Sequence, residues 1–183
     1  MRKATLYGLA AAFMLTACQS DFCRMTGEAH SMADGDTLCL TTDFASNTPF
    51  ATVIVEHGQF AWDTTVDTAY LCKIFRAGQP QGGTIFIVER GHVHISLEAK
   101  ADHSRVSGTQ LNNEWQSLCD GTAEDSRRIS RTVSELTKAG TPPAFIHDRV
   151  ARLYAQMEQR IADVGQRNKD NVLGRYILSH HKE

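Results

Sequence analysis

The first half of the chain alternates between hydrophobic and polar residues in short runs separated by turn residues. Side chains of a β-strand point alternately to opposite faces, so a period of two predicts strands buried on one side. Asp34-Gly35 and Arg90-Gly91 are two of the turn signals. Short strands separated by turns favour an antiparallel β-sandwich or a partly open barrel. The expected strands lie within Cys23–Gly27, Thr37–Thr41, Thr52–Val55, Phe60–Trp62, Tyr70–Phe75, Thr84–Val88, Val93–Leu97 and Arg105–Ser107.

In the second half the hydrophobic residues recur every three or four positions, which is the period of an amphipathic α-helix. One such stripe runs from Leu111 to Leu136, and the segment Ala139–Pro143 interrupts it with prolines that suit a helix start. A second stripe runs from Ile146 to Val164. A short final helix is expected over Asn171–Leu178. The predicted fold is therefore a β-domain followed by C-terminal helices.

The N-terminus has the features of an export signal. Arg2 and Lys3 precede an uncharged run over residues 4–17, which is too short to span a bilayer as a helix. The run ends in Leu-Thr-Ala-Cys at Cys18, and this motif resembles the lipobox cleaved by the lipoprotein signal peptidase. The resemblance implies that residues 1–17 are removed and that Cys18 carries the lipid. We therefore expect a lipid-anchored protein of the cell envelope, on the periplasmic face or at the outer membrane.

Charge and composition exclude one class of partner. The whole chain has a net charge of −2, and loss of Arg2 and Lys3 with the signal lowers it to about −4. No basic stripe or arm is visible, so a nucleic-acid partner is not expected. The expected organisation is a signal peptide over residues 1–17, a β-sandwich domain over 18–108 and a helical extension over 109–183. The membrane, reached through lipid on Cys18, is the first expected partner.

His92 and His94 are the candidate metal ligands of the sequence. Positions i and i+2 of a strand share one face, so the two imidazoles can reach a single ion. However, Val93, Ile95 and Leu97 form the opposing hydrophobic face, and the histidines are equally explained as the solvated side of a half-buried strand. No further ligands are placed beside them by spacing. We therefore expect neither a metal ion nor another cofactor.

The chain lacks the motifs of common enzymes. It has no Gly-x-Ser-x-Gly elbow, no His-Glu-x-x-His helix, no phosphate-binding glycine loop and no Cys-x-x-Cys pair. Of its five cysteines, Cys18 is assigned to lipid. Strand phase places Cys23 and Cys39 on opposite faces if their strands are adjacent, which disfavours a disulfide between them. An oxidising compartment permits other pairings, but we expect these two, Cys72 and Cys119 to act as small hydrophobic side chains. A non-catalytic role is expected.

The last predicted helix carries Leu173, Tyr176 and Ile177 close to residue 183. A short helix with a hydrophobic face at this position must dock on its own domain, on another chain, or on a domain that follows in a longer protein. These three residues are therefore candidates for partner binding, and docking on the chain's own β-domain is the alternative.

A set of turn and strand residues has the pattern of a known family: Gly27, Asp34–Leu40, Val55–Phe60, Phe86–Val93 and Val106–Thr109 with Asn112. Together with the lipobox they resemble a Bacteroidota lipoprotein domain of unknown function. In that family the domain usually precedes a thioredoxin-like (peroxiredoxin-type) disulfide oxidoreductase domain, and Asn171–Tyr176 resembles the approach to it. This chain ends where that domain would begin, so the redox activity itself is not carried over.

The resemblance implies a thioredoxin-like partner, either in trans or on a further C-terminal segment. Our leading hypothesis is a non-catalytic, membrane-anchored module that binds or positions such a redox partner. The alternative hypothesis is an envelope lipoprotein that binds a glycan, a peptide or a metal ion.

Overall fold

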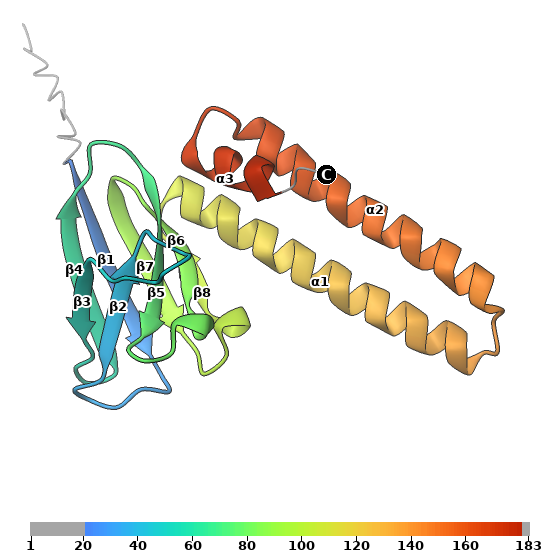
Figure 1. Ribbon diagram of the computed structural model, residues 1–183, viewed down its shortest axis with the longest axis horizontal. Helices are drawn as coiled ribbons and strands as arrows, with labels where there is room; N and C mark the ends of the chain where they lie inside the picture. The colour runs from blue at the N-terminus through green and yellow to red at the C-terminus, as the bar shows by residue number, and fades with distance from the viewer. Residues whose placement is uncertain (1–20, 181–183) are drawn as a thin grey trace, which may run out of the picture.

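The computed structural model describes residues 21–180 as two β-sheets followed by three helices (Figure 1). Cys18 and the predicted signal segment lie outside the described residues. Every expected strand is present, and the predicted sandwich with C-terminal helices is confirmed, without closure into a barrel. The strands are β1 (Phe22–Ala29), β2 (Thr37–Thr41), β3 (Ala51–Ile54), β4 (Gln59–Thr65), β5 (Tyr70–Arg76), β6 (Thr84–Val88), β7 (Gly91–Leu97) and β8 (Arg105–Ser107).

The strands form two four-stranded sheets, with the orders β4-β1-β7-β8 and β3-β2-β5-β6. Neighbouring strands are antiparallel except for β1 and β7, which pair in parallel with Met25 opposite Val93. This parallel pair departs from the expected antiparallel pattern. Its cause is the chain path, because the chain builds the whole second sheet between β1 and β7 and returns in the same direction.

The hydrophobic core lies between the two sheets. In β1 the side chains of Cys23 and Met25 are fully buried, whereas Arg24 between them is exposed, as the alternation predicts. Gly27 lies on the same buried side of β1 as Cys23 and Met25. A Cβ atom on Gly27 would lie 2.2 Å from a ring atom of Phe60. Glycine is therefore required at this position, because the aromatic ring occupies the space that any side chain would need.

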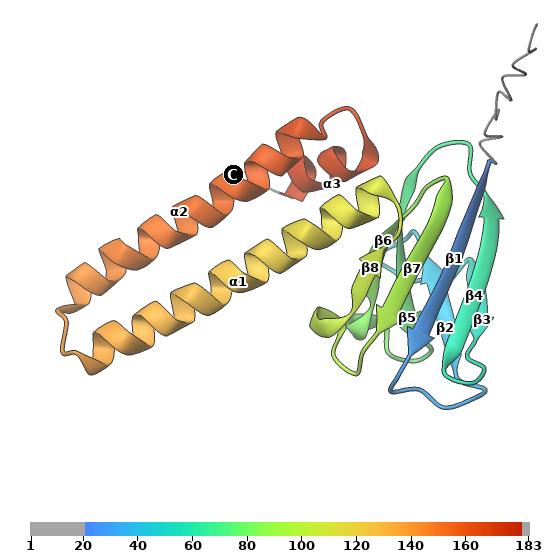
Figure 2. The same ribbon diagram turned by 180° about the vertical axis from the view of Figure 1, so that it is seen from behind.

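The helices α1 (Gln110–Lys138) and α2 (Pro143–Arg167) form an antiparallel hairpin that projects away from the sandwich (Figures 1 and 2). Helix α1 passes through Gly121 without a break, and Arg160 of α2 packs against that glycine. Asp125 is 4% exposed and forms ion pairs with Arg128 (3.3 Å) and Arg160 (3.2 Å). Among residues 21–180, no helix is long and apolar enough to cross a bilayer.

The short helix α3 (Val172–His180) folds back onto the chain itself. Leu173 and Ile177 are 0% and 3% exposed, in a cluster with Ile87 of β6 and Leu118 of α1. The sequence left open whether these residues dock on the chain's own domain or on a partner, and in the structure Leu173 and Ile177 pack against the chain itself. The pattern could not decide this, since a hydrophobic helix face looks the same whether it docks on its own sheet or on a partner.

A cleft between two sheet edges and helix α1

The first turns of α1 hydrogen-bond to the edge of the second sheet at β6. The backbone N–H of Ile87 donates to Oδ1 of Asn112 at 2.8 Å, and Nδ2 of Asn112 donates to the carbonyl of Ile87 at 2.7 Å. The indole N–H of Trp115 donates to the carbonyl of Ile85 at 3.0 Å. Edge strands leave such backbone groups without a neighbouring strand. The helix therefore supplies, through side chains, the partners that a further strand would provide.

The same helix also contacts the edge of the first sheet at β8. The backbone N–H of Val106 donates to Oε1 of Gln116 at 2.8 Å. In addition, Oε1 of Glu89, just after β6, accepts hydrogen bonds from the backbone N–H groups of Leu111 (2.9 Å) and Asn112 (3.3 Å). A carboxylate at a helix N-terminus satisfies free N–H groups and interacts favourably with the helix dipole. These contacts fix the start of α1 between the two sheet edges.

Next to these contacts, β6, β8 and α1 surround a cleft of about 620 Å³. This volume lies in the range of about 300–1,000 Å³ that is typical of ligand sites. Ile85, Val106 and Trp115 contribute hydrophobic lining, and the 3-10 turn Ala101–His103 forms one wall. Thr84 also lines the cleft, and its Oγ1 is buried without a hydrogen-bond partner among the described residues. The cleft is thus mixed in character, with hydrophobic and polar residues in its lining.

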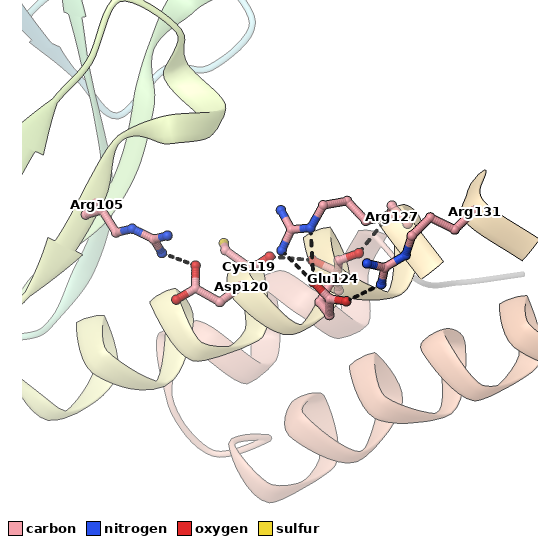
Figure 3. A network of polar contacts seen from close by, with 8 residues as sticks. Arg105, Cys119, Asp120, Glu124, Arg127 and Arg131 are labelled. Atoms are coloured by element: carbon pink, nitrogen blue, oxygen red, sulfur yellow. Dashed lines mark hydrogen bonds and ion pairs between the residues drawn. The ribbon is translucent and has the colours of Figure 1, made fainter. Parts of the chain in front are cut away.

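Figure 3 shows a network of charged side chains on β8 and α1, of which Arg105, Asp120 and Arg127 line the cleft. Arg105 of β8 forms an ion pair with Asp120 of α1. One turn further along α1, Glu124 accepts hydrogen bonds from both Arg127 (3.0 Å) and Arg131 (2.7 Å). Two guanidinium groups therefore share one carboxylate, but Asp102 also lines the cleft, so the three arginines are balanced by three carboxylates.

The two carboxylates remain ionised at neutral pH. Burial raises the pKa of Asp120, but hydrogen bonds from Arg105 and Gln116 outweigh that effect, and the net pKa is lowered. Hydrogen bonds from Arg127 and Arg131 lower the pKa of Glu124. These side chains are about half exposed, so the pairs set local charge and geometry more than they stabilise the fold.

Cys119 lines the cleft, but its thiol is not activated. Burial raises its pKa to about 11, so the thiol is protonated at neutral pH and is a poor nucleophile. Burial also raises the pKa of Cys72 to about 12. In the described part of the chain, Cys23, Cys39, Cys72 and Cys119 are all free, and the first three are buried. The prediction that they act as small hydrophobic side chains is confirmed for those three.

Cys23 and Cys39 do not lie on neighbouring strands, which is the case for which strand phase disfavoured a disulfide between them. Their strands, β1 and β2, belong to different sheets and are not adjacent. Cys23 lies in the core between the sheets, while Cys39 alternates with the core residues Leu38 and Leu40. The alternation of residues predicted the phase of each strand correctly, but it could not predict which strands are neighbours.

The structure places His92 and His94 on the outer face of the first sheet. The Nε2 atom of His92 is 2.7 Å from Oγ1 of Thr26, and the two form a hydrogen bond. His92 is exposed and His94 is partly buried. Within residues 21–180 no group of three or more His, Cys, Asp or Glu residues is arranged to hold a metal ion. The two histidines thus belong to the polar face of a half-buried strand.

Tyr176, the third partner-binding candidate, is partly buried in an aromatic cluster. Its ring meets the ring of Trp115 edge-on at a centroid distance of 5.8 Å and that of Phe44 at 6.5 Å. His180 packs against it at 4.3 Å. Burial raises the pKa of the Tyr176 phenol. Tyr176 therefore helps to hold α3 against α1 and the sandwich.

The sequence did not predict that Glu89 caps the N-terminus of α1, or that Gln116 accepts a hydrogen bond from the edge strand β8. Asn112 was part of the family pattern, but no role had been assigned to it. A signal was present, because Asn112 lies in the first turn of a predicted amphipathic helix, next to the hydrophobic residue Leu111. A polar residue that is fully buried there must find hydrogen-bond partners within the protein.

Comparison with known proteins identifies the family of the β-domain. A family model described as "Domain of unknown function (DUF4369)" matches residues 23–115. The matched segment begins in β1, includes both sheets, and ends with Trp115 in the first turns of α1. Curated proteins and solved structures gave no match. The chain belongs to the family of the domain of unknown function DUF4369.

Proposed function

We propose that this protein is a non-catalytic, lipid-anchored module of the cell envelope that binds and positions a partner protein. The observation that carries the proposal is the helical hairpin α1–α2. Helix α1 has 29 residues, which corresponds to a length of about 44 Å. Only its first turns contact the sheet edges, so most of its length is not needed to complete the sandwich.

The outer part of the hairpin exposes hydrophobic side chains. Phe145 at the start of α2 is 69% exposed, Tyr154 is 49% exposed and Val133 of α1 is 39% exposed. In this part of the hairpin Ile129 and Leu153 are the buried hydrophobic residues of the two helices. An arm that buries little of its own hydrophobic surface and exposes large side chains is suited to a protein contact.

The geometry is compatible with an anchor at the other end of the molecule. Cys18 precedes Asp21, the first described residue, by three positions. The tip of the hairpin lies far from the start of β1 in both views (Figures 1 and 2). Lipid on Cys18 would hold the start of β1 near the membrane and leave the hairpin tip free to reach a partner.

A thioredoxin-like protein is the partner that the family resemblance supports. The chain itself offers a protonated Cys119 and no Cys-x-x-Cys pair. In this proposal redox chemistry belongs to the partner, and this chain contributes attachment and orientation.

Photo-crosslinking in cells tests the proposal. A photoreactive amino acid replaces Phe145 in one strain and the exposed Asp67, in the β4–β5 loop, in a matched control. The proposal predicts a discrete adduct from position 145 that is absent from position 67, and mass spectrometry of that adduct should identify a thioredoxin-like protein. Equal labelling at both positions would contradict the role of the hairpin, and an unrelated partner would contradict the redox link.

A second candidate function is an envelope lipoprotein that binds a glycan, a peptide or a metal ion, and the cleft of about 620 Å³ favours it. For the metal version, elemental analysis of the purified protein is compared with a variant carrying His92→Ala and His94→Ala. Equal metal content in the two proteins would exclude these histidines as ligands.

A further inference from the structure

We infer that the cleft between β6, β8 and α1 binds a neutral saccharide, held by the paired charged side chains on its walls. This inference rests on the second candidate function, since it names the ligand class and the residues of that site. It does not depend on the hairpin contact around Phe145, so the two proposals can fail separately.

The strand edges that border the cleft are already bonded to α1. The amide of Asn112 bonds both backbone groups of Ile87, and the indole N–H of Trp115 donates to the carbonyl of Ile85. On the other edge, a glutamine of α1 accepts a hydrogen bond from the Val106 N–H. A peptide that added as a strand would need such backbone groups. The cleft must therefore recognise a ligand mainly through side chains, which disfavours an extended peptide.

The charged side chains that line the cleft balance one another. Arg105 and Arg127 are matched by Asp102 and Asp120, so the lining has no net formal charge when histidine is counted as neutral. A charged ligand would lose its hydration there without gaining a net opposite charge in return. The cleft therefore favours a neutral ligand that carries many hydrogen-bonding groups.

The ion pairs of the cleft leave donors and acceptors for a ligand. Arg105, through Nη1, and Gln116 both donate to Oδ1 of Asp120, so Oδ2 of this carboxylate can accept a further hydrogen bond. Arg127 uses Nε and Nη2 on Glu124, so its Nη1 can donate. At the Arg105–Asp120 pair, guanidinium N–H groups and a carboxylate oxygen lie side by side (Figure 3). A hydroxyl group both donates and accepts, so neighbouring hydroxyls of a sugar match this arrangement.

The hydrophobic lining suits the other surface of a sugar. Trp115 is partly buried, and its N–H is used on Ile85, so the indole offers carbon surface to the cleft. Val106 adds to that surface. A sugar ring presents C–H groups on its faces and hydroxyls around its rim, and C–H groups pack well on aromatic and aliphatic carbon. The volume of about 620 Å³ is ample for such a ligand.

A glycan microarray that carries neutral and acidic oligosaccharides, probed with the full-length protein purified in detergent, tests the inference. We expect binding to neutral oligosaccharides and none to acidic ones of similar size. The neutral oligosaccharide with the strongest signal is then titrated into the protein by calorimetry. Because that ligand is uncharged, a rise of about tenfold in salt concentration should change the Kd by less than about twofold.

Two substitutions on α1 locate the site. Ala123 is small, exposed and part of the cleft lining, so Ala123→Trp should fill the cleft. Asp120→Ala removes the proposed acceptor. Each substitution should raise the Kd by at least about tenfold, as expected for a blocked site or a lost hydrogen bond to a charged group. Both residues are exposed, so the urea unfolding midpoint should stay near that of the wild-type protein.

Helix α2 offers a matched control for each substitution. Ala155→Trp alters an exposed alanine outside the cleft. Asp163→Ala removes an exposed aspartate that accepts a hydrogen bond from the glutamine four residues before it, as Asp120 does. Neither control should change the binding of the oligosaccharide.

The inference is overturned if no neutral oligosaccharide binds, if acidic ones are preferred, or if the Kd rises steeply with salt. It is also overturned if Ala123→Trp and Asp120→Ala bind as well as the wild-type protein. That last result would place glycan binding elsewhere on the molecule and leave the second candidate function standing. None of these results affects the Phe145 crosslink, which tests the leading proposal separately.

Discussion

Replacement of Asn112 by leucine tests the physical basis of the junction between the sandwich and the helices. The substitution keeps the size of the side chain and removes its amide. The Ile87 N–H and carbonyl then lose their partners at 2.8 and 2.7 Å, in a place where Asn112 itself is fully buried. Each unsatisfied buried group costs about 1–3 kcal/mol. With two such groups, we expect Asn112→Leu to lower the free energy of unfolding by about 2–6 kcal/mol.

The neighbouring residue provides a matched control. Asn113 is exposed, and its Oδ1 accepts a hydrogen bond from the backbone N–H of Gly108 at 3.0 Å. Water can replace this contact, so Asn113→Leu should cost less than about 1 kcal/mol. Urea unfolding followed by circular dichroism and by tryptophan fluorescence measures both variants. An equal effect of the two substitutions would refute the claim that Asn112 completes the edge of β6.

Three further predictions concern other parts of the molecule. Gly27→Ala should destabilise the protein by about 1–3 kcal/mol in urea unfolding, because its Cβ would collide with the ring of Phe60; Gly82→Ala, with nothing within 4 Å of the added atom, is the control, and equal effects would contradict the packing argument. Leu173→Ala should cost about 2–5 kcal/mol, since its side chain is fully buried; a cost below about 1 kcal/mol would mean that α3 does not dock on its own chain in solution. At pH 8 the native Cys119 thiol should react with a disulfide reagent about 100-fold more slowly than a free thiol. The reaction should become faster as the pH rises toward the pKa of this thiol, about 11. Rapid reaction at pH 8 that is lost in Cys119→Ser would contradict the burial of the thiol.

The strands were predictable because each one buries a single face. Met25 and Val93 alternate with polar neighbours, and this alternation can be recognised from the sequence of each strand alone. The pairing of these two residues in parallel strands was not predictable in the same way. Turn signals specify hairpins between consecutive strands, whereas a parallel pair depends on contacts between distant parts of the chain.

The candidate cleft was only partly visible in the sequence. Glu124, Arg127 and Arg131 lie at helical spacing, so their mutual contacts follow from the predicted helix. The contact between Arg105 and Asp120 joins a strand to that helix and depends on where α1 crosses the sheet edges. The hydrogen bonds between Asn112 and the edge of β6 likewise depend on tertiary packing, which cannot be predicted from local periodicity.

One crosslinking experiment in cells shows directly whether a lipid-anchored chain holds a partner through its projecting hairpin. The photoreactive residue at position 145 is introduced into the wild-type chain and into a Cys18→Ser variant, and the adducts are followed through membrane and soluble fractions. A discrete adduct is expected in the membrane fraction for the wild-type chain, and it should be lost from that fraction for Cys18→Ser. An adduct that is unaffected by Cys18→Ser, or no adduct beyond that of the position-67 control, would contradict it.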